Sequence, residues 1–205
     1  TGEAMKESTA TLLDLRPTQF AVGMVQVRQK MAETRRVCNA ERYAFMEKRA
    51  IAVVHGPRGQ MYVIDHHHWA RAWIELGIER APVQIKMDFR DLDDIDFLAA
   101  MIERGWVHPF NERGQKVDIG SMPQTVAQMP DDPYQSLAAF LRIARVFENP
   151  GEFNAKFAWA DYLRQHVTGD SGTIEGFAEM LATAFRFAHT REAQALPGYI
   201  RDVQS

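Results

Sequence analysis

Three consecutive histidines, His66 to His68, directly follow Asp65 and are the residues of this chain best suited to acid–base chemistry. Neutral imidazole can accept a proton near pH 7, and a neighbouring carboxylate can orient the ring. Arg71 lies four residues after His67, the spacing that places two side chains on one face of a helix. Arginine keeps its charge and binds phosphate through two parallel hydrogen bonds. The pattern predicts an anion site whose catalytic candidates are His67, His68 and Asp65 and whose phosphate-binding candidates include His66 and Arg71.

The same histidines allow two other interpretations. One is a metal site, but adjacent helical residues point about 100° apart, so three in a row cannot all face one ion. The other is that they only cap the helix and support neighbouring groups through hydrogen bonds. We therefore expect no metal ligands in this stretch, and we favour acid–base or phosphate-binding chemistry over simple capping.

A β-hairpin that leads into a helix would position these side chains. Residues 51–54 and 61–64 are short apolar runs typical of strands, and residues 55–60 between them carry glycine and proline. After Asp65 the apolar residues follow helical spacing up to Gly77. This change predicts that Asp65 is the N-cap of the helix. The histidines would then lie in the first turn, where unpaired N–H groups and the helix dipole attract anions.

The order of these elements resembles the ParB-like nuclease family, whose fold group also includes sulfiredoxin. Residues 13–19 are similar to the family's arginine, proline and glutamine opening, and residues 62–68 to a pattern of roughly Ile-Asp-Gly-His-His-Arg. The resemblance covers about the first half of the chain. It implies that Arg16 and Gln19 border the motif helix and bind phosphate or another ligand. A surface ion pair is the other interpretation of Arg16.

The sequence departs from the family pattern at two positions. His66 stands where the family has its phosphate-binding glycine, and Trp69 stands where it has an arginine. A Cβ atom obstructs the approach of a phosphate to the backbone, and tryptophan lacks the forked donor of arginine. The chain therefore resembles a divergent subgroup of the family, labelled nuclease without a demonstrated activity. We expect weak or no binding of nucleoside triphosphates.

The bulk composition is that of an ordinary globular chain, with 46% hydrophobic and 25% charged residues among 205. A formal net charge of −3 argues against a dedicated DNA-binding protein, although basic residues gather between positions 35 and 58. A sulfiredoxin-type reaction would need a reactive cysteine inside the histidine motif. The single cysteine, Cys38, lies outside this motif. No apolar run approaches the roughly 18 residues of a membrane span. We expect no membrane association and a cytoplasmic location, although a chain that begins with Thr1 could have been trimmed.

Three regions follow one another along the chain. Residues 1–12 are small and polar and are expected to be mobile. Residues 13–115 carry the predicted strands and the motif, and residues 116–205 have mostly helical apolar spacing. A loop-rich stretch over 105–132 is long enough to be functional or to pack over a site. The predicted fold class is α+β: a small mixed sheet with helices, similar to ParB and sulfiredoxin, and a helical C-terminal half packed on it.

The leading functional hypothesis is a ParB-like protein with a phosphate- or nucleic-acid-directed cleft. If it is an enzyme, the expected reaction is phosphodiester hydrolysis, with one histidine as general acid or base and Arg71 and Arg16 neutralising phosphate charge. Two alternatives stay open: a non-catalytic ligand-binding or interaction module on the same fold, and a small-molecule phosphotransferase. The expected partners are a nucleic acid or a phosphorylated small molecule. The sequence specifies no cofactor and no oligomeric state.

Overall fold

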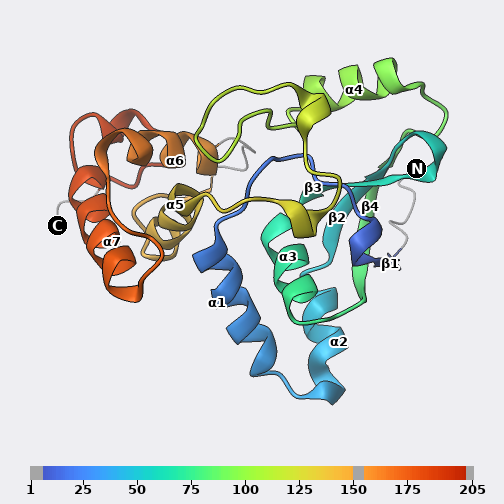
Figure 1. Cartoon of the computed structure of the whole chain (residues 1–205), viewed down its shortest axis with the longest axis horizontal. Helices are drawn as coiled ribbons and strands as arrows, with labels where there is room; N and C mark the ends of the chain where they lie inside the picture. Colours follow the sequence, from blue (N-terminus) through green and yellow to red (C-terminus); the bar gives the residue numbers. More distant parts are fainter. Residues whose placement is uncertain (1–6, 150–154, 202–205) are drawn as a thin grey trace. The chain divides into compact units, whose positions relative to one another are not determined.

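The computed structural model describes residues 7–149 and 155–201 and confirms the predicted α+β class (Figure 1). Its strands are β1 (Glu7–Thr11), β2 (Ile51–His55), β3 (Met61–Asp65) and β4 (Arg80–Asp88). Its helices are α1 (Met24–Arg35), α2 (Asn39–Glu47), α3 (His67–Glu75), α4 (Asp94–Glu103), α5 (Pro133–Ile143), α6 (Ala155–His166) and α7 (Ile174–Ala188). The chain divides into a sheet unit, residues 1–22 and 27–131, and a helical unit, residues 23–26 and 132–205.

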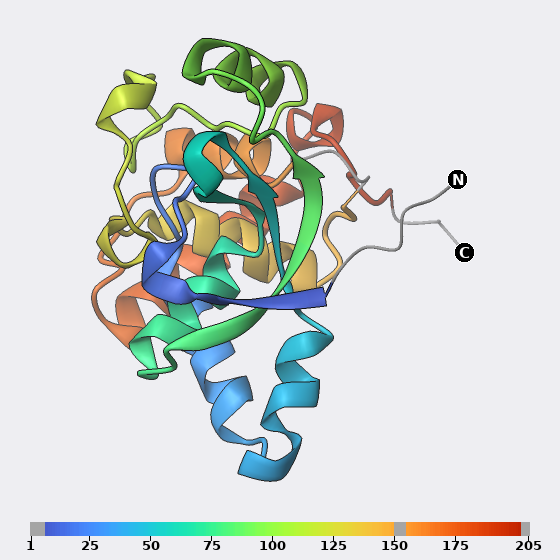
Figure 2. The same cartoon turned by 90° about the vertical axis from the view of Figure 1, so that its right-hand side faces the viewer.

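The sheet unit is built on a four-stranded mixed sheet in the order β1-β4-β2-β3 (Figure 2). The two outer pairs, β1 with β4 and β2 with β3, are antiparallel, and the central pair of β2 and β4 is parallel. In β2, residues 51–54 are all buried, as expected for the apolar run of a central strand. The hairpin and the following helix predicted from the sequence are both present, so the histidine motif lies at the β3–α3 junction.

The N-terminal segment differs from the mobile tail predicted over residues 1–12. Residues 1–6 lie outside the described part of the chain, but Glu7–Thr11 form β1 and pair with β4. Leu12 is fully buried, and its N–H donates to the carbonyl oxygen of Glu79 at 2.9 Å. Residues 7–11 are therefore ordered by backbone pairing with β4, and their own small, polar composition does not predict this pairing.

The two units meet in sequence at residues 131 and 132, later than the boundary expected at 115 and 116. Hydrogen bonds from the loop-rich stretch return to the opening segment, which explains the difference. The N–H of His108 donates to the carbonyl of Thr18 at 2.9 Å, and the N–H of Val22 donates to the carbonyl of Pro130 at 3.0 Å. Residues 116–131 therefore belong with the sheet.

The helical unit packs α5, α6 and α7 around its own core. Leu137, Leu141 and Leu163 are fully buried there, and the Phe147 and Trp159 rings stack with centroids 4.6 Å apart. Such aromatic and aliphatic burial accounts for a second core that is independent of the sheet. No helix in the described ranges is long and apolar enough to cross a bilayer.

Candidate functional site

The turn between β3 and α3 gives the histidine motif its shape. Asp65 is the last residue of β3 and pairs with Ala52 on β2, so the chain stays extended through Asp65. His66 is the N-cap of α3, and the prediction that Asp65 caps this helix is wrong. The exposed carboxylate of Asp65 instead accepts a hydrogen bond from the N–H of His66 at 2.7 Å.

His66 has a backbone conformation that favours glycine. Its φ of 70° and ψ of 29° lie in the left-handed region, where a Cβ costs roughly 1 kcal/mol. The resemblance places the family's glycine at this position, and glycine adopts this conformation without the strain of a Cβ. The ring contributes a compensating contact, because its Nδ1 lies 2.9 Å from the carbonyl oxygen of Ala50.

His67 and His68 are buried, with 3% and 5% of their surfaces exposed. The backbone N–H of Thr18 donates to Nε2 of His67 at 3.1 Å, which places the proton of a neutral His67 ring on Nδ1. His67 therefore connects the first turn of α3 to the opening segment. The catalytic roles of His67, His68 and Asp65 stay predictions. In the part of the chain that the structure describes, no group of histidine, cysteine or acidic residues could hold a metal ion.

Arg71 ties α3 to the loop-rich stretch. Its guanidinium donates to the carbonyls of Met129 at 2.8 Å and Val126 at 3.3 Å, and its Nε donates to Glu75 at 2.7 Å. The side chain is only 12% exposed. These contacts of Arg71 and the contact of His67 to Thr18 thus go to different segments of the sheet unit. The role of His67 and Arg71 as a working pair stays a prediction.

Trp69, at the family's arginine position, is a core residue. It is 7% exposed and lies 5.8 Å from the rings of both Phe45 and Trp73. The ammonium group of Lys30 lies 4.1 Å from its ring centroid. A cation–π contact of this kind stabilises the helix against its neighbours and offers no donor to a phosphate.

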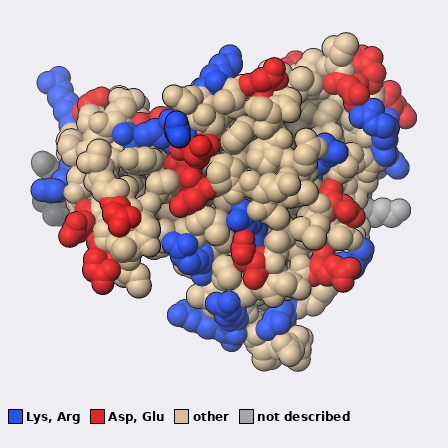
Figure 3. Space-filling view, viewed as in Figure 1, with Lys and Arg blue, Asp and Glu red and all other residues tan. Residues whose placement is uncertain are grey.

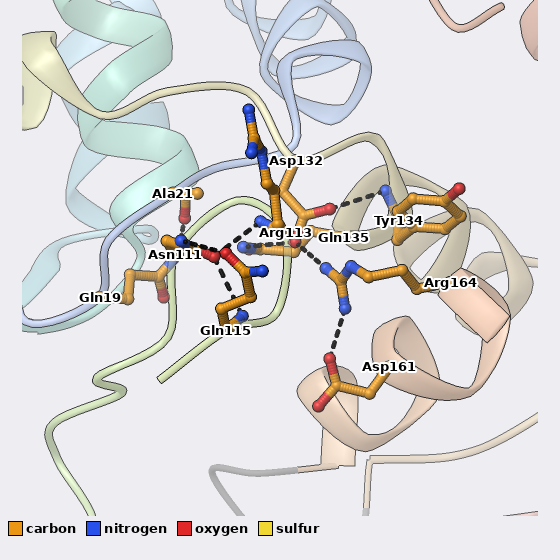
Figure 4. Close-up of polar contacts among 10 residues, drawn as sticks. All are labelled: Gln19, Ala21, Asn111, Arg113, Gln115, Asp132, Tyr134, Gln135, Asp161 and Arg164. Carbon is orange, nitrogen blue, oxygen red and sulfur yellow. Dashed lines mark hydrogen bonds and ion pairs between the residues drawn. The ribbon is translucent and has the colours of Figure 1, made fainter. Parts of the chain in front are cut away.

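The opening segment runs beside β3 and carries the other two predicted ligand-binding residues. The carbonyl of Arg16 accepts from the N–H of Val63 at 2.8 Å, which fixes the backbone of Arg16. Gln19 is 2% exposed, and its amide donates to the carbonyl of Ala21 at 2.7 Å (Figure 4). Arg16 is different, because its guanidinium reaches Gln124 at 2.6 Å at the edge of a pocket.

This pocket has a volume of about 250 Å³ and lies wholly within the sheet unit. The opening segment, β3, α4 and the loop over 119–124 form its wall. Its polar side chains come from Arg16, Thr18, Tyr62, Asp94 and Gln124. The remaining wall is mainly apolar and includes Phe97, Leu98, Met101, Val107, Ile119 and Met122. A mostly apolar cavity with a few convergent polar groups is typical of a small-molecule site.

Charge in this pocket is unevenly compensated. Asp94 forms a two-point ion pair with Arg58, at 2.8 and 3.1 Å, and the hydrogen bonds from Arg58 lower the pKa of Asp94. Arg16 has no carboxylate within ion-pair distance in the described ranges, and Gln124 offers it only a neutral amide. The Thr18 hydroxyl already donates to the carbonyl of Val63 at 2.6 Å. Arg16 is therefore the cation in this pocket that is available to an anion.

Sequence reasoning found Arg16 but missed Tyr62, Asp94 and Gln124. Asp94 and Gln124 lie outside the family-like stretches, Tyr62 has no counterpart in the quoted family pattern, and the three reach the pocket from separate segments of the chain. The length of the loop-rich stretch was the one available signal for Gln124. Only the way this loop returns to the opening segment shows which of its residues lies next to Arg16.

A separate polar cluster lies inside the helical unit (Figure 4). Asp132 is the N-cap of α5 and accepts from the N–H of Tyr134 at 3.1 Å. Arg164 binds Asp132 at 2.6 Å, contacts Asp161, and lies 5.1 Å from the centre of the Tyr134 ring. Ser136 contacts a different group and accepts from the backbone N–H of Gln26 at 3.2 Å. Because two carboxylates neutralise Arg164, this cluster serves as a structural tie.

A family model described as "Putative ParB-like nuclease" matches residues 8–165, well over half of the chain. The chain belongs to the ParB-like nuclease family. Both positions at which it departs from the family pattern, His66 and Trp69, lie inside the matched range.

Among solved structures, the chain is similar to protein Atu1540 from Agrobacterium tumefaciens, with 32% identity, a TM-score of 0.86 and coverage of 96% of this chain and 97% of that one. A second match is the C-terminally truncated chromosome-partitioning protein ParB from Caulobacter crescentus complexed with CTP-gamma-S, at 12% identity. It covers 89% of this chain and 90% of that one, but its TM-score of 0.30 carries no argument about fold or ligand. No curated protein matches this chain.

Proposed function

We propose that this member of the ParB-like nuclease family binds a small phosphorylated molecule in the pocket beside Arg16. The observation that carries the proposal is the unneutralised guanidinium of Arg16 at the edge of a mainly apolar pocket. A guanidinium can bind a phosphate through two parallel hydrogen bonds, which are stronger than hydrogen bonds between neutral groups. A bound phosphate that displaced the amide of Gln124 would have both donor nitrogens of the Arg16 guanidinium available.

The apolar wall of the pocket indicates the rest of the ligand. The rings of Tyr62 and Phe97 lie 4.8 Å apart and form an aromatic surface. A volume of about 250 Å³ lies just below the usual range of ligand pockets, which begins at roughly 300 Å³. A compact phosphomonoester with an apolar or aromatic body fits this space and this charge. A triphosphate would bring several negative charges to a single arginine.

The contacts of the histidine turn favour binding without catalysis. A general base needs a free lone pair within reach of its proton, and Nε2 of His67 already accepts from Thr18. Family membership favours a second candidate, phosphodiester hydrolysis with His67 as the base. That reaction would require the hydrogen bond between Thr18 and His67 to break when substrate binds.

Calorimetric titration tests the proposal. Phenyl phosphate and ribose 5-phosphate would be compared with phenol and ribose, which lack the phosphate, and with benzoate, which replaces it by a carboxylate. We expect the aromatic phosphate to bind most tightly and the neutral compounds not to bind. Arg16→Ala should weaken binding at least about tenfold, since a charged hydrogen bond contributes about 1.5–3 kcal/mol. Arg113→Ala, an exposed arginine of the same unit, is the matched control.

The outcomes separate the candidates. If no phosphate binds at millimolar concentration, or if Arg16→Ala binds as tightly as the wild type, the proposed site is wrong. Turnover of bis(p-nitrophenyl) phosphate that is lost in His67→Ala, with or without added Mg²⁺ or Mn²⁺, would favour hydrolysis. Absence of turnover together with binding that depends on Arg16 supports a non-catalytic ligand-binding module.

A further inference from the structure

Positive charge is concentrated in one segment of this acidic chain. Residues 24–49, here called the basic hairpin, form α1, α2, the turn between them and the two residues after α2. They contain seven Lys and Arg against three Glu, a net charge of +4. Because the whole chain has a net charge of −3, the remaining residues sum to −7. Figure 3 shows Lys and Arg side chains gathered over α1 and α2. The net charge of the whole chain does not reveal this separation of positive from negative residues.

Most cations of the basic hairpin lack acidic partners within the described ranges. Six of them have no carboxylate within ion-pair distance there: Arg28, Arg35, Arg36, Arg42, Lys48 and Arg49. Elsewhere in the sheet unit, four arginines are ion-paired: Arg58 with Asp94, Arg71 with Glu75, Arg90 with Asp88 and Arg104 with Glu103. The hairpin therefore combines a net charge of +4 with six cations that have no carboxylate within ion-pair distance in the described ranges.

The geometry of these cations suits an extended polyanion. Arg28, Arg35, Arg36 and Lys48 are exposed. Arg28 and Arg35 are two turns apart on one side of α1, about 10 Å at 1.5 Å per residue. Most of the six are arginines, which pair with phosphate in a forked geometry that lysine cannot supply. A chain of regularly spaced phosphates would contact several of them at once.

An exposed aromatic ring lies among these charges. Tyr43 on α2 is 55% exposed, an unusual position for a large aromatic side chain. Arginines interleaved with an exposed ring are typical of surfaces that bind single strands, where cations contact the backbone and an aromatic face stacks on a base. A bilayer surface would need a continuous apolar face, and Tyr43 is the one large exposed apolar side chain of the basic hairpin.

We propose that the basic hairpin is a docking surface for single-stranded nucleic acid, which it binds without sequence preference. The surface is separate from the Arg16 pocket, because no residue of the hairpin lines that pocket. The two proposals can therefore fail independently. Binding depends on phosphate neutralisation by arginine and lysine, and stacking on Tyr43 favours a single strand over a duplex.

Fluorescence anisotropy with a labelled single strand longer than about 16 nucleotides, the upper site size of common single-strand-binding folds, tests the proposal. The variant Arg35→Ala/Arg36→Ala/Lys48→Ala removes three exposed cations. Its slope of log affinity against log salt should be shallower by about 2, because each phosphate contact contributes about 0.7. The charge-matched control Arg80→Ala/Arg90→Ala/Arg113→Ala should leave the slope unchanged. Circular dichroism of both variants verifies that the fold is intact.

Tyr43→Ala provides a second, uncharged test. It should weaken single-strand binding at least about fivefold and leave duplex binding unchanged, since a stacked base contributes about 1–3 kcal/mol. Scrambled sequences of the same composition should bind equally well. The proposal is overturned if the wild type does not bind at low salt, or if the control variant loses as much affinity as the hairpin variant. Binding to polyglutamate or to phosphatidylserine vesicles without binding to the oligonucleotide would assign the surface to another partner.

Discussion

The backbone N–H of Thr18 donates to Nε2 of His67 over 3.1 Å, and both residues are 97% buried. This bond joins two segments that are 49 residues apart in the sequence, the opening segment and the first turn of α3. His67, which the sequence suggested as a catalytic base, thereby supports the backbone segment that positions Arg16 at the pocket.

His67→Ala should lower the free energy of unfolding by about 1–3 kcal/mol, because the buried N–H of Thr18 loses its acceptor. Urea denaturation followed by circular dichroism measures the change. His189→Ala is the control, because His189 is exposed and its ring lies 2.7 Å from the carbonyl oxygen of Phe185, in the last turn of α7. A His67→Ala protein as stable as His189→Ala would show that the hydrogen bond does not support the fold.

Substitutions at His66 should show a preference for glycine over alanine. Both His66→Gly and His66→Ala lose the contact to Ala50, but only alanine retains a Cβ in the left-handed conformation. We expect the glycine variant to be more stable by roughly 1 kcal/mol. Ala32→Gly in α1 should change stability in the opposite sense, because glycine destabilises a helix interior. Equal stability of the two His66 variants would argue against strain at this turn.

The two carboxylates that bind Arg164 should contribute unequally to stability. The Asp132 side chain is 4% exposed and also caps α5, whereas the Asp161 side chain is 50% exposed. Asp132→Ala should cost about 3–5 kcal/mol, since it leaves a mostly buried cation without its main partner. Asp161→Ala should cost at most about 1 kcal/mol. Thermal unfolding of both variants measures the difference, and similar losses would contradict the assignment.

Asp88 should remain ionised in acid. Hydrogen bonds from the Arg90 side chain lower its pKa to about 2, below the value of about 3.9 for an unfolded chain. A depressed folded-state pKa contributes stability that is complete above about pH 4 and is lost as the pH falls towards 2. An NMR titration of the Asp88 carboxyl should give the low value in the wild type and a value near 4 in Arg90→Ala. A wild-type midpoint near 4 would show that the ion pair is too exposed to shift it.

Nucleoside triphosphates should bind weakly or not at all. The Cβ of His66 obstructs the turn where the family pattern has glycine, and the buried Trp69 cannot replace the arginine. Loss of one charged two-point contact should cost on the order of 2 kcal/mol, or about thirtyfold in affinity. Calorimetry with the four ribonucleotides tests this. A dissociation constant below about 1 µM for any of them would mean that the substitutions matter less than we expect.

The local sequence was enough to place the hairpin, the motif helix and the α+β class. These follow from interactions between near neighbours: β-branched runs, turn residues between them, and a change from strand to helical spacing after Asp65. The family resemblance carried by the same stretch is confirmed by the match over residues 8–165. The sequence also identified Arg16 as a candidate, because it lies in the similar opening segment.

Only the tertiary structure decided what the candidate residues contact. Side chains four apart on a helix share a face, but whether that face meets a cleft or a carbonyl depends on segments far along the chain. His67 meets Thr18, and Arg71 meets Val126 and Met129. Arg16 lines a pocket, because a loop over 100 residues later places Gln124 beside it. Short-range patterns determine elements, whereas a site is assembled by long-range packing that no local pattern records.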